Sequence, residues 1–220
     1  MQNSQINIYF DSFDEIIVGL MKIGIKNNNE SLIDNAIDAL INIIINSTPD
    51  LSNNLVILYN KALDFLVNRT TYDYVPEINF NIQSSLCSII STVLYKLKEF
   101  HYNNFQIDQD IIEILYDMLN SKNMCIYEEC LMTISAIINS LYIQRNLLEL
   151  LTPNKIKVLI TEFVFNGIKS MNPNIIKASC NLISNIYYFL SKSIPDLHHY
   201  IPSIFDDFSY ILLKHNELRV

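Results

Sequence analysis

The sequence predicts an all-α protein built from repeated pairs of helices, and three observations lead to that fold class. Four segments with small residues at their centre recur, and aligning Ala36, Ser85, Cys130 and Ser179 gives spacings of 49, 45 and 49 residues. Apolar residues recur every three or four positions, which is the period of a helix. Only 3 Gly and 6 Pro interrupt the 220 residues, too few for the turns of a sheet protein of this size.

A repeat of this length is typical of HEAT and armadillo proteins. In such an α-solenoid, antiparallel helix pairs stack into a right-handed superhelix, and each pair buries its apolar side against its neighbours. We therefore expect one continuous HEAT/armadillo-like domain over residues 1–220.

Turn signals divide the chain into four helix pairs and one unpaired helix. Breaks fall at Asn27-Asn28-Asn29, at Pro49 and around Pro76, and Pro173 lies at a helix start, where its missing N–H costs nothing. The predicted pairs are 10–46, 51–100, 107–142 and 154–192, and the unpaired helix is 197–215. Because the sequence stops before that helix gains a partner, we expect the chain to be a piece of a longer protein.

Within each predicted pair, the second helix carries the repeated small residues. The second helices are expected at Ser31–Asn46, Asn79–Phe100, Met124–Tyr142 and Pro173–Lys192, after first helices at Phe10–Lys26, Leu51–Arg69, Ile107–Leu119 and Asn154–Ser170. In the helix predicted at Phe10–Lys26, for example, Ile16, Leu20 and Ile23 recur at helical spacing on one face.

The charge of the chain restricts its partners. With 15 Lys and Arg against 23 Asp and Glu, the formal net charge is −8 and the pI is about 4.9. Such a surface repels the phosphates of nucleic acids and of anionic lipids, so we expect neither nucleic acid nor membrane as a partner. A basic peptide is the partner that the charge favours.

The four Cys are interpreted as reduced core thiols. Cys87, Cys130 and Cys180 lie near the small-residue positions of the aligned second helices, Cys125 lies at the start of one of them, and no CxxC motif occurs. No signal peptide or membrane-spanning apolar run is found, so we expect a location in the cytoplasm and nucleus and no disulfide framework.

Several strings resemble the importin β (karyopherin β) family of nuclear transport receptors, and they are collinear with it from about residue 10 onward. The resemblance covers the middle-to-late repeats of that family. The strings are Tyr-Glu-Glu-Cys-Leu-Met-Thr-Ile-Ser-Ala at 127–136, Ile-Gln-Ser-Ser-Leu-Cys at 82–87, Val-Leu-Tyr-Lys-Leu at 93–97, Phe-Val-Phe-Asn-Gly-Ile-Lys at 163–169, and Ile194-Pro195 with Tyr200 and Asn216-x-x-Arg219. The connection at 143–153 is longer than in the family, and the early acidic loop and the N-terminal repeats are absent.

The resemblance implies three partners and a monomeric receptor. Importin β-like receptors hold the basic importin-β-binding segment of importin α, or basic cargo, and Ran-GTP on the concave face lined by second helices. Carboxylates there would form charge-assisted hydrogen bonds with Lys and Arg, and the candidates are Asp34, Asp38, Glu128 and Glu129. The alternative for each of them is a solvated helix face.

The third implied partner is the set of Phe-Gly nucleoporins, which dock in grooves between first helices on the convex side. The candidate aromatic residues for such grooves are Phe163, Phe165, Phe205, Phe208 and Tyr210. Their helical spacing is equally typical of ordinary core residues, which is the alternative for each.

Signatures of catalysis are few. His198 and His199 are adjacent, so on a helix they would point about 100° apart and could not share a metal. Asp206-Asp207 near His199 lack a strained nucleophile turn. We therefore expect a protein that is not an enzyme and has no cofactor or metal. The alternative function is a HEAT-repeat scaffold subunit of another assembly, such as a phosphatase scaffold or a vesicle-coat adaptor.

Overall fold

The structure, a computed structural model, describes residues 30–67, 80–102, 104–108, 110–121, 123–144, 150–193 and 206. All regular structure among these residues is helical and no strand occurs among them, so the all-α prediction is confirmed there. The elements are α3 (Glu30–Ile45), η1 (Pro49–Leu51), α4 (Ser52–Val67), α5 (Phe80–Glu99), α6 (Asp110–Asn120), α7 (Met124–Gln144), α9 (Pro153–Val158), η2 (Leu159–Val164), α10 (Phe165–Lys169) and α11 (Pro173–Ser193).

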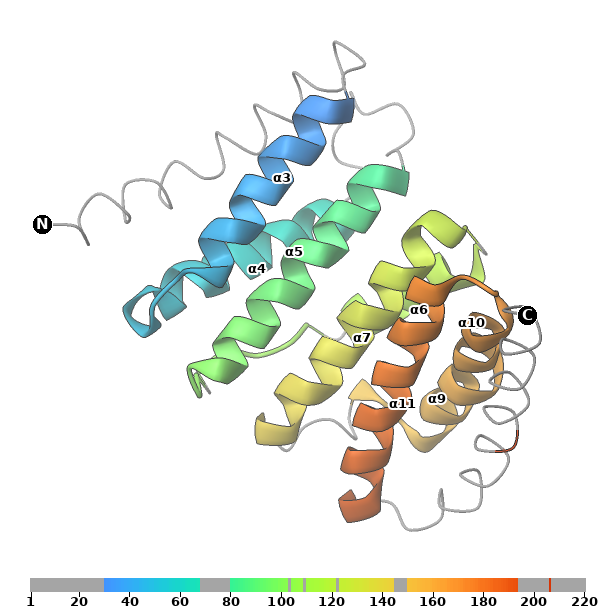
Figure 1. The fold of residues 1–220 in the computed structure, drawn as a ribbon. Helices are drawn as coiled ribbons and strands as arrows, with labels where there is room; N and C mark the ends of the chain where they lie inside the picture. Colours follow the sequence, from blue (N-terminus) through green and yellow to red (C-terminus); the bar gives the residue numbers. More distant parts are fainter. Residues whose placement is uncertain are drawn as a thin grey trace, which may run out of the picture.

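The helices form two layers (Figure 1). Helices α3, α5, α7 and α11 lie side by side in chain order and are called here the second-helix layer. Helix α4 packs against α5, α6 against α7, and α10 against α11, so three of the predicted pairs are in contact. The predicted helices at 10–26 and 197–215 lie outside the described residues, apart from Asp206, which is helical. The two layers are compatible with an α-solenoid, which is taken up below as a proposal.

Hydrogen bonds between side chains and neighbouring helices fix the register of the second-helix layer. Thr133 and Ser140 of α7 donate to the carbonyl oxygens of Cys87 and Leu94 on α5, at 3.0 and 3.4 Å. On the other side of α7, Asn185 of α11 donates to the Ser135 hydroxyl at 2.6 Å. The bonded residues are 46 apart between α5 and α7 and 50 apart between α7 and α11. The sequence spacings of 45 and 49 therefore lie within one residue of the offsets in the structure.

Helix α6 illustrates why these segments fold as they do. Its buried residues Ile111, Ile112, Leu115, Met118 and Leu119 occupy one side of the helix at helical spacing. The helix begins at Asp110 rather than at Ile107. Before it, the Asp108 carboxylate accepts a hydrogen bond from the Asp110 N–H at 2.9 Å, a local bond that competes with helix formation. Ile107 is buried, although it precedes the helix, so it contributes to the core from a segment without regular structure.

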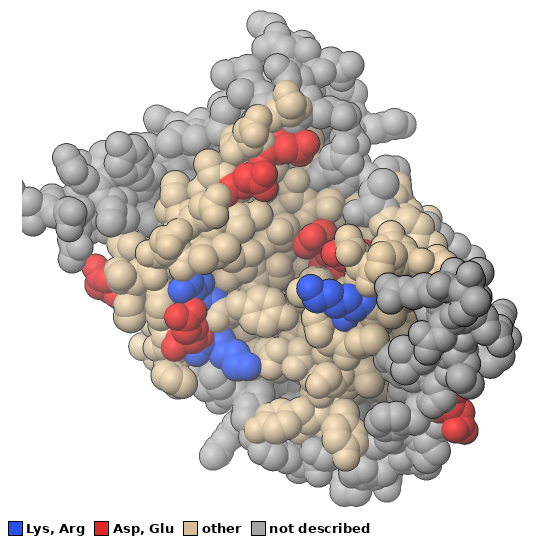
Figure 2. Space-filling view, in the orientation of Figure 1, with Lys and Arg blue, Asp and Glu red and all other residues tan. Residues whose placement is uncertain are grey.

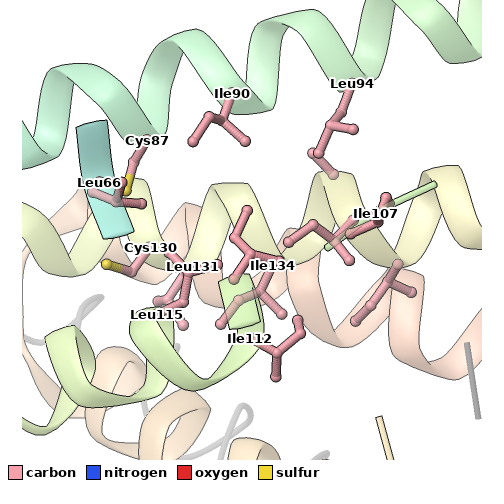
Figure 3. Packing of buried hydrophobic residues seen from close by; sticks show 14 of the residues in the cluster. Leu66, Cys87, Ile90, Leu94, Ile107, Ile112, Leu115, Cys130, Leu131 and Ile134 are labelled. Atoms are coloured by element: carbon pink, nitrogen blue, oxygen red, sulfur yellow. The ribbon is translucent and has the colours of Figure 1, made fainter. Parts of the chain in front are cut away.

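One hydrophobic core runs between the layers. Figure 3 shows Ile90 and Leu94 of α5 directed toward Ile134 of α7, with Leu115 of α6 on the far side of α7. All four side chains are fully buried, and burial of each contributes about 1.5–3 kcal/mol. The core therefore joins neighbouring helix pairs as well as the two helices of one pair.

The helix from Pro153 to Lys169 contains a π-helical turn that the sequence pattern did not predict. Thr152 caps its first turn, accepting a hydrogen bond from the Lys155 N–H, and residues Leu159–Val164 form the π-helix η2 between α9 and α10. Two tyrosines of other helices bind its backbone. Tyr116 of α6 donates to the Lys155 carbonyl and Tyr127 of α7 donates to the Phe163 carbonyl, both at 2.7 Å.

None of the described helices combines the length and the apolar character needed to cross a membrane.

Candidate partner-binding surface

The four candidate carboxylates lie on two helices of the second-helix layer. Asp34 and Asp38 are exposed and stand one turn apart on α3, so both project from the same side of that helix. Glu128 and Glu129 are half-buried in the second turn of α7. Helix α5 lies between α3 and α7 (Figure 1), so the two acidic pairs lie on helices that are not adjacent in the second-helix layer.

Glu129 has an unusual environment for a carboxyl group. Burial, and next the charge of Glu128, raise its pKa from 4.5 to about 7. Glu128 and Glu129 take no part in the ion pairs that Lys96 forms with Glu99 and Lys155 forms with Glu113. A half-buried carboxyl group in this position gains from the approach of a cation, because a positive charge favours its ionised form.

The face of the second-helix layer carries charges of both signs. Figure 2 shows acidic atoms over α3, and basic together with acidic atoms over the C-terminal part of α5. Lys96 there pairs with Glu99 at 3.0 Å, and Lys98 donates to the Asn139 amide oxygen of α7 at 2.9 Å. These two Lys side chains therefore already have partners. Asp34 and Asp38 lie in the second turn and at the middle of α3, and Glu128 and Glu129 lie near the N-terminal end of α7.

The described aromatic candidates lie in the helix Pro153–Lys169, which together with α4 and α6 forms the other layer, called here the first-helix layer. Phe163 is 4% exposed and packs edge-on against the Tyr116 ring, with centroids 5.3 Å apart, so it belongs to the core. Phe165 is half-buried, and the Lys169 ammonium lies 5.8 Å from its ring centroid. Phe205, Phe208 and Tyr210 lie outside the described residues.

The structure adds residues that the sequence analysis did not single out. Tyr116 and Tyr127 connect α6 and α7 to the backbone of the helix that contains η2. Burial raises the pKa of Tyr127 to about 12, in keeping with a hydroxyl group that stays protonated as a donor. A lone Tyr in an amphipathic helix gives no sequence signal of such a bond, because its partner is a backbone carbonyl of a distant segment.

The cysteines and the metal-binding side chains complete the survey. Cys87 and Cys130 are buried, Cys180 is half-buried, and all three are free thiols. Among the described residues, no three His, Cys, Asp or Glu side chains are grouped so that they could hold a metal ion. His198 and His199 lie outside the described residues, as does the side chain of Cys125.

Comparison of the chain with protein-family models, with curated proteins and with solved structures finds no match.

Proposed function

We propose that this chain is a helical-repeat scaffold that binds another protein across the second-helix layer. The observation that carries the proposal is the regular arrangement of α3, α5, α7 and α11, in which α7 is bonded to both neighbours through residues 46 to 50 apart. Repeated helices in register create an extended surface, and such surfaces bind partners through many small contacts.

The finer form of the proposal is an α-solenoid of the importin β type that carries protein cargo between cytoplasm and nucleus. Its support is the set of collinear sequence strings and the net charge of −8. Its partners would be the basic segment of importin α or basic cargo, Ran-GTP and Phe-Gly nucleoporins. In this proposal Asp34, Asp38, Glu128 and Glu129 bind cationic groups, and Phe165 contributes to a Phe-Gly groove.

The experiment is a binding assay between the full chain and a synthetic basic importin-β-binding segment, with matched variants. The test variants are Asp34→Asn with Asp38→Asn, and Glu128→Gln with Glu129→Gln. The control is Asp64→Asn with Asp117→Asn, which neutralises two exposed carboxylates on α4 and α6 of the first-helix layer. We expect each test variant to weaken binding at least tenfold, since the loss of even one charge-assisted hydrogen bond costs about 1.5–3 kcal/mol and about 1.4 kcal/mol is a factor of ten. The control should leave affinity within about twofold.

The outcomes separate the two forms of the proposal. Binding of the basic segment, Ran-GTP and Phe-Gly repeats supports the transport receptor. Binding of a phosphatase catalytic subunit or a coat protein through the same face, without those three partners, supports the alternative scaffold. Equal losses in the test and control variants would contradict a role for the second-helix layer.

A further inference from the structure

We propose that Cys87 and Cys130 are a redox-active pair that closes a disulfide between α5 and α7. Both residues are 0% exposed and lie on neighbouring helices of the second-helix layer. The neighbouring Cys87 thiol is the first cause of the raised pKa of Cys130, and burial is the next. Figure 3 shows the two side chains at the same end of the interface between α5 and α7, beside Leu66.

The two helix backbones approach each other closely at Cys87, which favours a disulfide at this point of the interface. Thr133, one turn after Cys130, places its short side chain 3.0 Å from the carbonyl oxygen of Cys87 itself. Ser140 reaches the Leu94 carbonyl in the same way two turns further along. A hydroxyl oxygen bonded directly to Cβ can do this only where the backbones are near each other, and a disulfide requires Cα atoms within about 4.4–6.8 Å.

The reaction is a two-electron oxidation by a peroxide. One thiolate attacks hydrogen peroxide, which forms a sulfenic acid and releases hydroxide, and the hydroxide takes up the proton lost from the thiol. The second sulfur then displaces the hydroxyl group from the sulfenic acid, which forms the S–S bond and releases water. Two thiols and one peroxide thus give one disulfide and two waters.

The surroundings of the pair make this reaction slow and selective. The neighbouring Cys87 thiol and burial raise the pKa of Cys130, so little thiolate is present at neutral pH and oxidant enters only when α5 and α7 separate briefly. Cys180 is half-buried and is therefore reached first. Once formed, the disulfide fixes α5 against α7 and restricts movement within the second-helix layer.

The test is oxidation of the full chain with hydrogen peroxide, followed by peptide mapping without reduction. We expect a linked peptide that contains Cys87 and Cys130. In the unfolded, unreduced protein neither of these cysteines should react with an alkylating reagent, and both should react after reduction. Amide exchange in α5 and α7 should be slower in the oxidised protein. A Cys125→Ser/Cys180→Ser variant isolates the pair, and a Cys125→Ser/Cys130→Ser variant, which keeps Cys87 and Cys180, should form no internal link.

Two results would overturn the proposal. One is that both thiols remain open to alkylation after an exposure to peroxide that is long enough for the amides of α5 and α7 to exchange, with Cys180 fully oxidised. The other is a link between any other two cysteines, or sulfinic acid at Cys87 or Cys130 without a link. Because the mapping is also done on the wild-type chain, the result does not depend on whether the Ser variants fold.

Discussion

Gly167 shows how a single missing side chain sets the distance between two helices. A Cβ atom at this position would lie 2.2 Å from the Ser179 hydroxyl oxygen of α11, 3.3 Å from Ile175 Cγ2 and 3.4 Å from Leu131 Cδ1. The Ser179 hydroxyl is buried and has no hydrogen-bond partner within the described structure. Gly167 lowers the helix propensity of α10, and the Ser179 hydroxyl is buried without a hydrogen bond to any described residue. In return, α10 and α11 pack closely at this point.

We predict that Gly167→Ala destabilises the protein in a way that depends on Ser179. Overpacking costs about 1–3 kcal/mol, which exceeds the gain of about 1 kcal/mol from placing Ala in a helix. In a Ser179→Ala background the nearest clash is removed, so the same substitution should become neutral or stabilising. Urea unfolding of the four proteins in this double-mutant cycle measures the difference. Equal effects in both backgrounds would show that the contact does not limit the packing.

Glu129 leads to a prediction about pH. Burial and Glu128 raise the pKa of Glu129 from 4.5 to about 7, so the native protein holds this proton more tightly than the unfolded chain does. The stability that this proton provides at low pH is therefore lost as the pH rises from about 4.5 to about 7. Glu129→Gln should remove this dependence and increase stability above neutral pH by about 1–2 kcal/mol, after allowance for solvent screening of a half-buried group.

The measurement is urea unfolding of wild type and variant across that pH range. The exposed Glu162→Gln substitution is the control and should change neither the slope nor the stability at high pH. If Glu129→Gln leaves the pH dependence unchanged, the environment of Glu129 is not the cause.

At the scale of elements, the π-helix η2 depends on contacts from outside its own segment. Tyr127 donates to the Phe163 carbonyl inside η2, and the Phe163 ring packs against Tyr116 of α6. A π-turn is intrinsically less favourable than an α-turn, and such turns occur often at functional sites. In this protein the turn lies where α6, α7 and the helix Pro153–Lys169 meet.

We predict that Tyr127→Phe destabilises the protein by about 0.5–1.5 kcal/mol, because the buried hydrogen bond to Phe163 is lost. Amide exchange should accelerate within Leu159–Val164 more than in α5. Tyr95→Phe is the matched control, since the hydroxyl of this half-buried Tyr on α5 makes no hydrogen bond within the described structure. Exchange that rises equally in both variants would assign the effect to general loss of stability.

The elements also show what the sequence can and cannot specify. Helices α4 to α7 were predictable because their apolar residues follow the helical period and Pro or Asn marks the breaks. The π-turn was not, since Leu-Ile-Thr-Glu-Phe-Val over 159–164 has the pattern of an ordinary amphipathic helix. The sequence predicts the start of this helix at Ile107, because a buried Ile outside a helix has the same signal as one within it.

At the scale of the whole molecule, the repeat spacing predicted which helices become neighbours, and the charge pattern predicted which carboxylates to examine. Asp34 and Asp38 are exposed as their positions suggested, whereas Glu129 is half-buried because α7 is enclosed by α5 and α11. The sequence spacing alone cannot reveal such enclosure, because it depends on how closely the neighbouring helices approach. The resemblance to importin β stays an interpretation of the sequence strings.

The offsets of 46 to 50 residues between bonded helices have a consequence for how the chain folds. Each new helix of the second-helix layer closes a chain segment of nearly constant length, so the entropy lost at each closure is nearly equal. Assembly can then start at α5 and α7, where hydroxyl groups meet backbone carbonyls, and extend by one neighbour at a time in either direction. Folding of this kind proceeds by addition of successive units, and its rate is set by the first interface that forms.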